Sequence, residues 1–340
     1  MKKSVKIKQS VLFAEHLYRS HRVKQVLLLL LMIFGGIVQL KGQEINTSVE
    51  KVYVVFKTHL DVGFTDLSSV VTQRYITEFI PKALDVSEKL RAENTEEKYI
   101  WTTGAWLIWK YLHTAPPEDV KRLEAAIRRG DIVWNALPYT VESESMNQDL
   151  FETCLLLSQK LDEKYGKRTI AAKMTDVPGH TRSIVAPMCR AGIRFLHIGV
   201  NPACPIPAVP EFCRWRDTDG SELILVYQQD YGSESVLPGG KSVISINFTG
   251  DNHGPHSYSA VKSIYVNLHK RYPKARLIAS SFNEIAQELT TIQDRLPVVT
   301  SEIGDTWIYG YGSAPIRMAK FRSLCTLYSK WLHEKRIEKN

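Results

Sequence analysis

The run "VYVVF" (residues 52–56) is followed directly by "KTHLDVGFTD" (57–66). Five apolar, largely β-branched residues predict a strand that is buried on both faces, and the polar residues after them mark where it ends. His59 and Asp61 stand two residues apart, and in an extended chain such residues project to the same face. An imidazole and a carboxylate could therefore aim at one point as metal ligands. The alternative is a chance H-x-D sequence in which His59 only caps a turn.

Downstream of this strand, short β-branched runs alternate with amphipathic stretches. Residues 116–130, "PPEDVKRLEAAIRRG", predict a helix with Pro in its first turn, acidic residues early, Arg late and Gly130 as its stop. A second helix is predicted from Leu150 to Tyr165, and a capping box at Ser281 and Glu284 predicts the start of another. Further strands are predicted at 131–135, 169–175, 193–200, 222–227 and 243–249. Strands separated by helices indicate parallel βαβ units, and hence an α/β sheet or barrel.

Two more polar stretches follow predicted strands. Asp176 and His180 lie in "MTDVPGH" (174–180), and the stretch "GDNHGPH" (250–256) holds Asp251, His253 and His256. Ligands of α/β folds bind at the carboxyl ends of the strands, where these loops meet. A catalytic Zn²⁺ takes about three protein ligands and leaves one position open. Asp176 is therefore a candidate third ligand beside His59 and Asp61.

The charge of the chain is concentrated in its first residues. The 340 residues carry a formal net charge of +8, and residues 1–42 hold eight Lys or Arg against one Glu, which leaves the remainder close to neutral. A nucleic-acid-binding domain carries its positive charge on the folded domain, so nucleic-acid binding is not expected. Neither G-x-G-x-x-G, a P-loop nor G-x-S-x-G occurs, so dinucleotide, nucleotide and serine-hydrolase functions lack their signatures.

The basic N-terminal stretch leads into an apolar run from Val26 to Leu40. The run is short for a membrane span, and it predicts a signal peptide over residues 1–42 with cleavage near Gly42 and Gln43. We therefore expect a secreted or periplasmic protein with no membrane contact after cleavage. The alternative is an uncleaved single-span anchor. The unusually long basic region suggests that the assigned start lies too far upstream.

The five cysteines form no C-x-x-C pair, so a thiolate metal site is not expected. Cys204 and Cys213 bracket a Pro-rich loop and could form a disulfide. Buried free thiols are the alternative.

The order of these motifs resembles a known enzyme family. A strand followed by His59-Leu-Asp61-Val-Gly-Phe64, and a later strand followed by Asp176-Val-Pro-Gly-His180-Thr, are similar to the catalytic domain of the family 38 glycoside hydrolases, the retaining class II α-mannosidases. That family has H-x-D-x-G and an aromatic residue after its first strand, and D-P-F-G-H-S after a later one. The resemblance covers roughly residues 50–330 and is closest to a divergent bacterial branch.

The resemblance implies a fold and a domain plan. It predicts a seven-stranded-type parallel β/α barrel over residues 50–312, followed at 313–340 by the start of a helical region that this chain truncates. The substrate would be a glycan with α-mannoside-like bonds. Oligomeric state does not follow from the resemblance.

The resemblance also implies roles for the site residues. His59, Asp61 and Asp176 would hold Zn²⁺, and Asp176 would also be the nucleophile that forms a glycosyl-enzyme intermediate. Zn²⁺ would bind sugar hydroxyls and orient the ring. Phe64 would stack under the sugar, with ordinary core packing as its alternative.

Four further residues complete the predicted site. His180 would donate a ring N–H near Asp176, orienting that carboxylate beside the substrate. Asp251 is the candidate general acid/base, and a simple turn residue is the alternative. Tyr309 and Tyr311, in "DTWIYGYGSAP" (305–315), could line the substrate site, and ordinary packing is the alternative.

This chain departs from the family in one respect that bears on the metal. The family's Zn²⁺ has a further His ligand from a segment well beyond the barrel, and here His253 or His256 would have to replace it. Two other functions remain open: a metal-dependent carbohydrate de-N-acetylase on a related barrel, and a truncated, non-catalytic carbohydrate-binding domain. The former usually has H-x-x-x-H, whereas "HGPH" (253–256) spaces its histidines three apart.

Overall fold

The computed structural model describes residues 45–338, apart from 177–179, 204–206 and 305–311. The chain divides into two units, Met1–Ile45 and Asn46–Asn340, and the fold is that of the second unit. The predicted signal peptide and Tyr311 lie outside the described residues. Across the described ranges, none of the helices has the length and apolar character needed to traverse a lipid bilayer.

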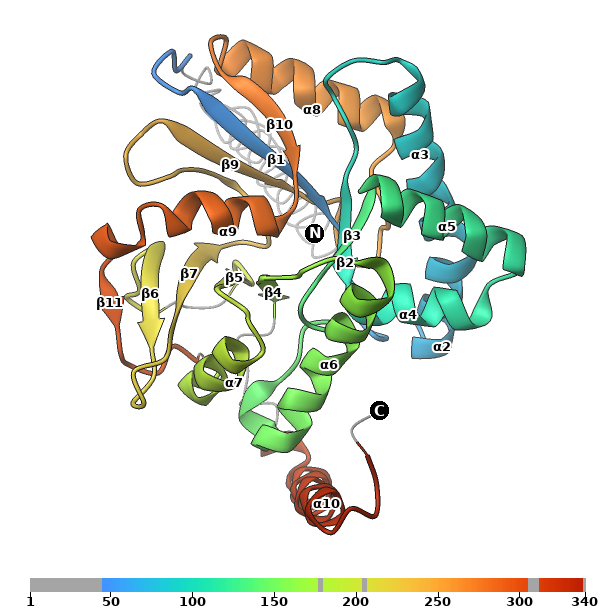
Figure 1. Cartoon of the computed structure of the whole chain (residues 1–340), viewed down its shortest axis with the longest axis vertical. Coiled ribbons are helices and arrows are strands. Elements are labelled where there is room, and N and C mark those ends of the chain that lie inside the picture. The colour runs from blue at the N-terminus through green and yellow to red at the C-terminus, as the bar shows by residue number, and fades with distance from the viewer. Residues whose placement is uncertain (1–44, 177–179, 204–206, 305–311, 339–340) are drawn as a thin grey trace, which may run out of the picture. The chain divides into compact units, whose positions relative to one another are not determined.

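The strands form two mostly parallel sheets (Figure 1). The first has the order β3-β2-β1-β9-β8, with β10 also pairing with β1; its strands are β1 (Lys51–Lys57), β2 (Trp101–Gly104), β3 (Ile132–Asn135), β8 (Glu234–Val236), β9 (Ser242–Asn247) and β10 (Arg276–Ser280). The second has the order β11-β6-β7-β5-β4; its strands are β4 (Ala171–Asp176), β5 (Phe195–Val200), β6 (Phe212–Arg216), β7 (Glu222–Gln229) and β11 (Val298–Val299). Only the pairs β8–β9 and β6–β7 are antiparallel among these described strands. The predicted α/β class with parallel strands is confirmed.

The closed seven-stranded barrel is not confirmed. Two strands pair with the same edge of β1: β10 pairs with Lys51–Val55, and β2 pairs with Phe56 and Lys57. Between β3 and β4 the contact is not a ladder: Ala136 N donates to Ala171 O (2.9 Å), and the Asn135 side-chain oxygen accepts from Lys173 N (3.3 Å). A side-chain amide thus stands where backbone pairing would close the barrel, and the strands remain in two sheets.

The helices begin and end close to their predicted boundaries. Residues 116–130 contain α5 (Pro117–Arg129), which stops where Gly130 adopts φ +82°. The second predicted helix is α6 (Gln148–Tyr165), which begins two residues early because Asn147 caps it by accepting from Leu150 N (3.1 Å). The capping box at Ser281 and Glu284 opens α9. The other α-helical bounds are α2 (Ser68–Arg74), α3 (Ile80–Ala92), α4 (Ala105–Thr114), α7 (Val185–Arg190), α8 (Tyr258–Arg271), α9 (Phe282–Thr290) and α10 (Pro315–His333).

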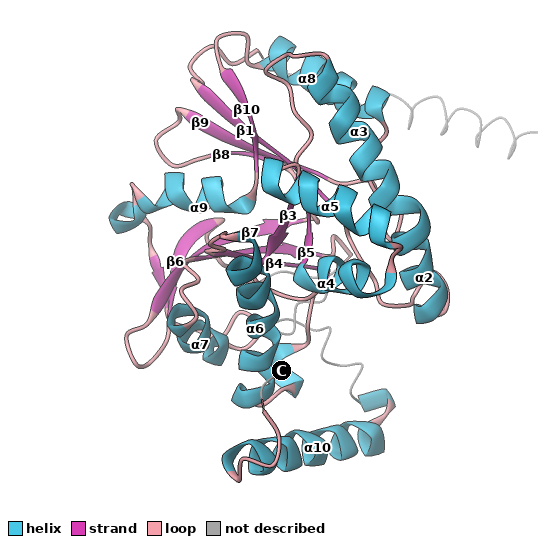
Figure 2. Ribbon diagram, turned by 45° about the vertical axis from the view of Figure 1, so that its right-hand side comes forward, coloured by secondary structure: helices cyan, strands magenta, loops and turns pink. Residues whose placement is uncertain are grey.

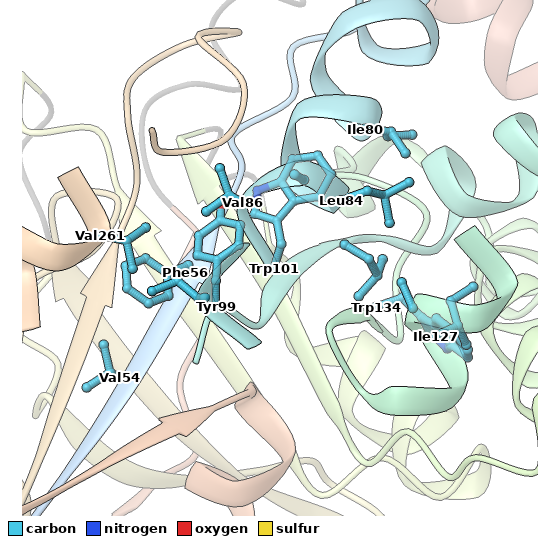
Figure 3. Packing of buried hydrophobic residues seen from close by; sticks show 14 of the residues in the cluster. Val54, Phe56, Ile80, Leu84, Val86, Tyr99, Trp101, Ile127, Trp134 and Val261 are labelled. Carbon is cyan, nitrogen blue, oxygen red and sulfur yellow. The ribbon is translucent and has the colours of Figure 1, made fainter. Parts of the chain in front are cut away.

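Both faces of β1 are buried, as its sequence predicts. Val52, Val54 and Phe56 pack in a cluster with residues of α3, α5 and α8 (Figure 3), whereas Tyr53 and Val55 face an inner cluster that also includes side chains from the second sheet and α9. Helix α9 lies between the two sheets in both views (Figures 1 and 2). Burying each such apolar side chain contributes about 1.5–3 kcal/mol. This packing holds β1 firmly and thereby places the residues that follow it.

Candidate functional site

The loops after β1 and β9 lie side by side at the carboxyl end of the first sheet. His59 and Asp251 form an isolated parallel bridge beyond the β1–β9 ladder. Asn252 N donates to His59 O (3.1 Å). The polar stretches around His59 and Asp251 therefore meet because their two strands pair.

Three carboxylates surround the ring nitrogen Nε2 of His59. Asp61 Oδ1 lies 3.2 Å from it, and Asp176 Oδ2 and Asp251 Oδ1 each lie 3.8 Å from it. His59, Asp61 and Asp251 each offer a ligand atom, and these three atoms lie within 4.8 Å of one another. The structure thus brings together the three residues predicted as metal ligands and adds Asp251 to them.

The orientation of the His59 ring suits a metal ligand. Its Nδ1 lies 3.0 Å from Thr175 Oγ1, and the ring stacks on Tyr231 with centroids 4.7 Å apart. With the proton on Nδ1, where it donates to Thr175, Nε2 presents its lone pair to the carboxylates. Burial lowers the pKa of His59, although the nearby Asp61 carboxylate opposes this, and so favours the neutral ring. A lone pair and several carboxylate oxygens that face one another repel, and a cation bound between them would remove that repulsion.

Asp61 supplies a direct test of whether a cation fits. Its Oδ2 is buried and has no hydrogen-bond partner among the described residues. A buried carboxylate oxygen without a partner is costly, and a bound cation removes that cost. Imidazole and carboxylate oxygens are ligands that Zn²⁺ accepts. The residues present fit a metal ion at this position.

Asp176 is held in a strained but well-supported conformation. It adopts φ +77°, a value that side chains other than glycine rarely take. Its Oδ1 accepts a hydrogen bond from Asn201 Nδ2 (2.8 Å) and another from the Tyr231 hydroxyl. Oδ2 is left facing His59. The sequence analysis did not find Asn201 or Tyr231, because each follows a different strand of the second sheet and neither belongs to a motif.

Asn252 clamps the loop that carries Asp61. Its side-chain oxygen accepts from Asp61 N (2.9 Å), and its Nδ2 donates to Asp61 O (3.2 Å), Gly63 O (3.2 Å) and Thr65 Oγ1 (2.9 Å). The residue is buried and has φ +53°, which asparagine tolerates better than most side chains. The one signal in the sequence was its position directly after Asp251, but asparagine is common in turns, so it was not among the predicted site residues.

Two buried lysines lie beneath the carboxylates. Burial lowers the pKa of Lys173 to about 8, and nearby Asp61 and Asp176 act in the opposite direction. Burial also lowers the pKa of Lys57, whose Nζ sits 4.6 Å from the centre of the Phe248 ring and has no hydrogen-bond partner among the described residues. The sequence placed Lys173 inside a predicted strand and Lys57 directly after one, and it gave no sign of an electrostatic role for either lysine.

The remaining predicted site residues fall in different surroundings. Phe64 is 84% exposed with φ +59°, so core packing does not explain it. Asp251 is partly exposed, and burial together with the nearby Asp61 and Asp176 raises its pKa, while His59 opposes the rise. Tyr311 and Tyr309 lie outside the described residues.

Three histidine predictions need correction. His180 is buried, and neither ring nitrogen has a hydrogen-bond partner among the described residues, so it does not orient Asp176 as expected; Asn201 and Tyr231 do so instead. His256 packs edge-on against Phe56 (centroids 5.2 Å apart), inside the core rather than at the metal cluster. His253 is exposed, and its Nδ1 contacts Thr249 O (3.2 Å). In the described part of the chain, neither His253 nor His256 joins the His59 cluster.

Cys213 is a buried free thiol, and Cys204 lies outside the described residues.

Comparison with solved structures places this geometry on a known fold. An α-mannosidase from Enterococcus faecalis V583 matches with a TM-score of 0.60 and 16% sequence identity, over 75% of this chain and 31% of that chain. The chain has the fold of part of a family 38 structure. A second E. faecalis protein, described as belonging to glycosyl hydrolase family 38, matches with a TM-score of 0.51 and 14% identity, over 75% of this chain and 29% of that one.

A different enzyme shares the fold as well. The 4-α-glucanotransferase from Thermococcus litoralis matches with a TM-score of 0.52 and 14% identity, over 84% of this chain and 47% of that chain. No family model and no curated protein matches the sequence. The chain spans about a third of the length of the two family 38 structures. The motif resemblance to family 38 is thus matched by similarity of fold.

Proposed function

We propose that this chain is a zinc-dependent retaining glycoside hydrolase that cleaves α-mannoside-like bonds of glycans, with Asp176 as the nucleophile. The observation that carries the proposal is the convergence of Asp61, Asp176 and Asp251 on Nε2 of His59 at the carboxyl ends of parallel strands. The order of the sequence motifs and the fold shared with a solved α-mannosidase support it.

The metal would be held by His59, Asp61 and a further carboxylate. Asp251 has an oxygen within the same close group of ligand atoms, and Asp176 Oδ2 lies at the same distance from His59 Nε2. When bound, Zn²⁺ would accept sugar hydroxyls and orient the ring. Asn252 keeps the Asp61 loop in place for this purpose through its four hydrogen bonds.

Asp176 suits a nucleophile because one of its oxygens is fixed and the other is free to react. Asn201 and Tyr231 hold Oδ1, so Oδ2 keeps a defined direction. Oδ2 would attack the anomeric carbon and form an ester bond, while the glycosidic C–O bond breaks and its oxygen takes a proton. Water would then hydrolyse the ester and regenerate the carboxylate.

Asp251 would supply the proton to the leaving oxygen. Burial raises its pKa, and the side chain is still 40% exposed, so it can both hold a proton and reach a substrate. The alternative is that Asp251 is a metal ligand. The two roles exclude each other, because a metal-bound carboxylate is ionised.

Asp251→Ala separates these roles. If Asp251 is the acid/base, the variant keeps its zinc and still reacts with an aryl glycoside whose leaving group needs no proton, and azide restores turnover. If Asp251 is a ligand, zinc is lost and azide restores nothing. Zinc is measured by elemental analysis of the purified protein, with Asp66→Ala as a control at a partly exposed aspartate of the neighbouring loop.

The nucleophile is tested by covalent labelling. An activated fluoro-sugar should glycosylate Asp176 as its leaving group departs, and the label should be found there by peptide mass spectrometry; a label on another residue would overturn the role. Release of acetate from an N-acetylated glycan, with no reducing sugar, would favour a de-N-acetylase. Sugar binding without either product would favour a non-catalytic carbohydrate-binding domain.

The domain plan and location belong to the same proposal. Residues 1–42 would be removed as a signal peptide, residues 50–312 would form the catalytic domain, and the protein would be secreted or periplasmic. The N-terminal sequence of the mature protein, isolated from its own host, tests the cleavage near Gly42.

A further inference from the structure

A cavity of about 310 Å³ lies at the amino ends of β2, β3 and β4. Its walls come from segments that precede strands: residues 98–100 before β2, 129–130 before β3, and 167–169 before β4. Ser281, Asn283 and Glu284, at the start of α9, complete it. Along β4, Thr169 at the cavity precedes the first strand residue and Asp176 at the cluster is the last one, so these two residues are roughly 20 Å apart along the chain.

The lining of this cavity is strongly basic. Five cationic side chains line it, against the single carboxylate of Glu284; they are Arg91, Lys98, Arg129, Lys167 and Arg168. Glu284 is already engaged, since its Oε2 accepts from Ser281 N (2.7 Å) in the capping box. Lys98, Lys167 and Arg168 form no ion pair with any described carboxylate. The cavity therefore has an excess of positive charge.

Two of the arginines are set in place by a buried acid. Asp131 is 1% exposed and receives Arg91 through one oxygen and Arg129 through the other, the latter at 2.9 Å. Arg91 also donates to Arg129 O (3.1 Å). One carboxylate thus holds two guanidinium groups side by side at the cavity. Scattered surface arginines seldom have such support, and each of these retains further N–H donors.

The cavity also has apolar walls. Ile100, Ile132, Val133 and Trp134 contribute to its lining. The Trp134 ring nitrogen donates to Asp162 (3.0 Å), which fixes the indole. Asp162 itself is occupied, because it also accepts from Thr169 N (2.7 Å). A ligand with both an anionic group and an organic body matches these surroundings.

We infer that this cavity binds a small organic molecule bearing a phosphate or sulfate ester, of about the size of a sugar. Guanidinium groups bind tetrahedral oxyanions through paired hydrogen bonds, and lysines add charge without demanding geometry. A volume of about 310 Å³ is at the small end of ligand pockets and accommodates one such unit. The site is separate from the His59 cluster and does not depend on the proposed hydrolase function.

The test is calorimetric titration of the full chain with glucose 6-phosphate, glucose 6-sulfate, inorganic phosphate and uncharged glucose. We expect binding of at least one sugar ester, no binding of glucose at this site, and weaker binding as ionic strength rises. A preference between the two esters identifies which oxyanion the cavity takes. Inorganic phosphate should bind more weakly than the preferred ester if the apolar wall contributes.

The matched variants reverse two charges at a time. Lys167→Glu with Arg168→Glu should weaken binding by about tenfold or more, since both side chains are exposed and lose attraction to the anion. Lys121→Glu with Lys270→Glu makes the same charge change at exposed positions outside the cavity and should leave binding within about twofold. No binding of any ester, or equal loss in both double variants, overturns the inference.

Discussion

The two ends of the parallel strands carry opposite charge and are built differently. At the carboxyl end, Asp61, Asp176 and Asp251 surround His59, and hydrogen bonds from other loops fix Asp61 and Asp176. At the amino ends of β2, β3 and β4, five cations line a cavity, and a buried acid fixes two of them. Carboxylate oxygens held in fixed directions are suited to binding a metal and attacking a substrate. A cavity lined by several cations is suited to binding an anion. The following changes test that contrast.

The largest effect should come from Asp176→Asn. An amide is a poor nucleophile, so kcat/KM toward an α-mannoside substrate should fall by about a thousandfold or more. Binding of sugar esters at the basic cavity should not change. If the variant retains most of its activity, Asp176 is not the nucleophile, and the proposed catalytic role of the carboxyl end is weakened.

Asn252→Ala should weaken the structure around Asp61 at the carboxyl end and leave ligand binding at the basic cavity unchanged. The change deletes four hydrogen bonds and leaves buried groups of the Asp61 loop unpaired, so unfolding free energy should fall by about 2–4 kcal/mol and zinc affinity should drop. Urea unfolding and zinc titration measure the two effects.

The control for Asn252 is Asn94→Ala. Asn94 has nearly the same backbone conformation, φ +56°, but is exposed. Its replacement therefore carries the same backbone strain without the clamp. Equal destabilisation by the two changes would mean that backbone conformation, and not the hydrogen bonds, accounts for the loss.

Acidification should weaken the core behind the carboxyl end. Burial lowers the pKa of His256 from 6.5 to about 4. Between these values the unfolded chain binds more protons than the folded one, so stability is complete above about pH 6.5 and is lost as the pH falls toward 4. At about pH 5 the loss from this residue should be about 2 kcal/mol.

Replacement of His256 by Phe should remove that contribution. The difference in unfolding free energy between about pH 7 and pH 5 should shrink by about 2 kcal/mol, because Phe keeps the contact with Phe56 and does not titrate. His269→Ala, at an exposed position, should leave the difference unchanged. An unaltered pH dependence in His256→Phe would show that His256 is not held neutral.

The smallest effect should be that of the Lys167→Glu, Arg168→Glu double variant on hydrolysis. Lys167 and Arg168 are separated from Asp176 by the whole of β4, roughly 20 Å or more, which exceeds the Debye length at physiological salt, so kcat/KM should change by less than about twofold. Assays at low and high ionic strength check this. A larger loss would mean that the two ends are coupled.

Many of the secondary-structure elements could be predicted from local sequence. The apolar run 52–56, the Pro and Gly that bound α5, and the capping box of α9 each depend on neighbours within a few residues. Local sequence could not tell whether the strands close into a barrel. Closure depends on contacts between distant strands, namely the Asn135 side chain against β4 and the pairing of β10 and β2 along one edge of β1. The antiparallel strand β6 (Phe212–Arg216) was also not foreseen, because "FCRWR" mixes apolar and charged residues and its partner is β7.

The candidate site divides in the same way. His59, Asp61, Asp176 and Asp251 could be selected from the sequence because each follows a strand, and strand ends are local features. Asn252, Asn201 and Tyr231 could not, because their roles lie in hydrogen bonds to residues far along the chain. The sequence alone determined which groups stand at the carboxyl ends of the strands. Only the tertiary structure decided which of them meet, since contacts between distant loops are set by strand pairing and packing.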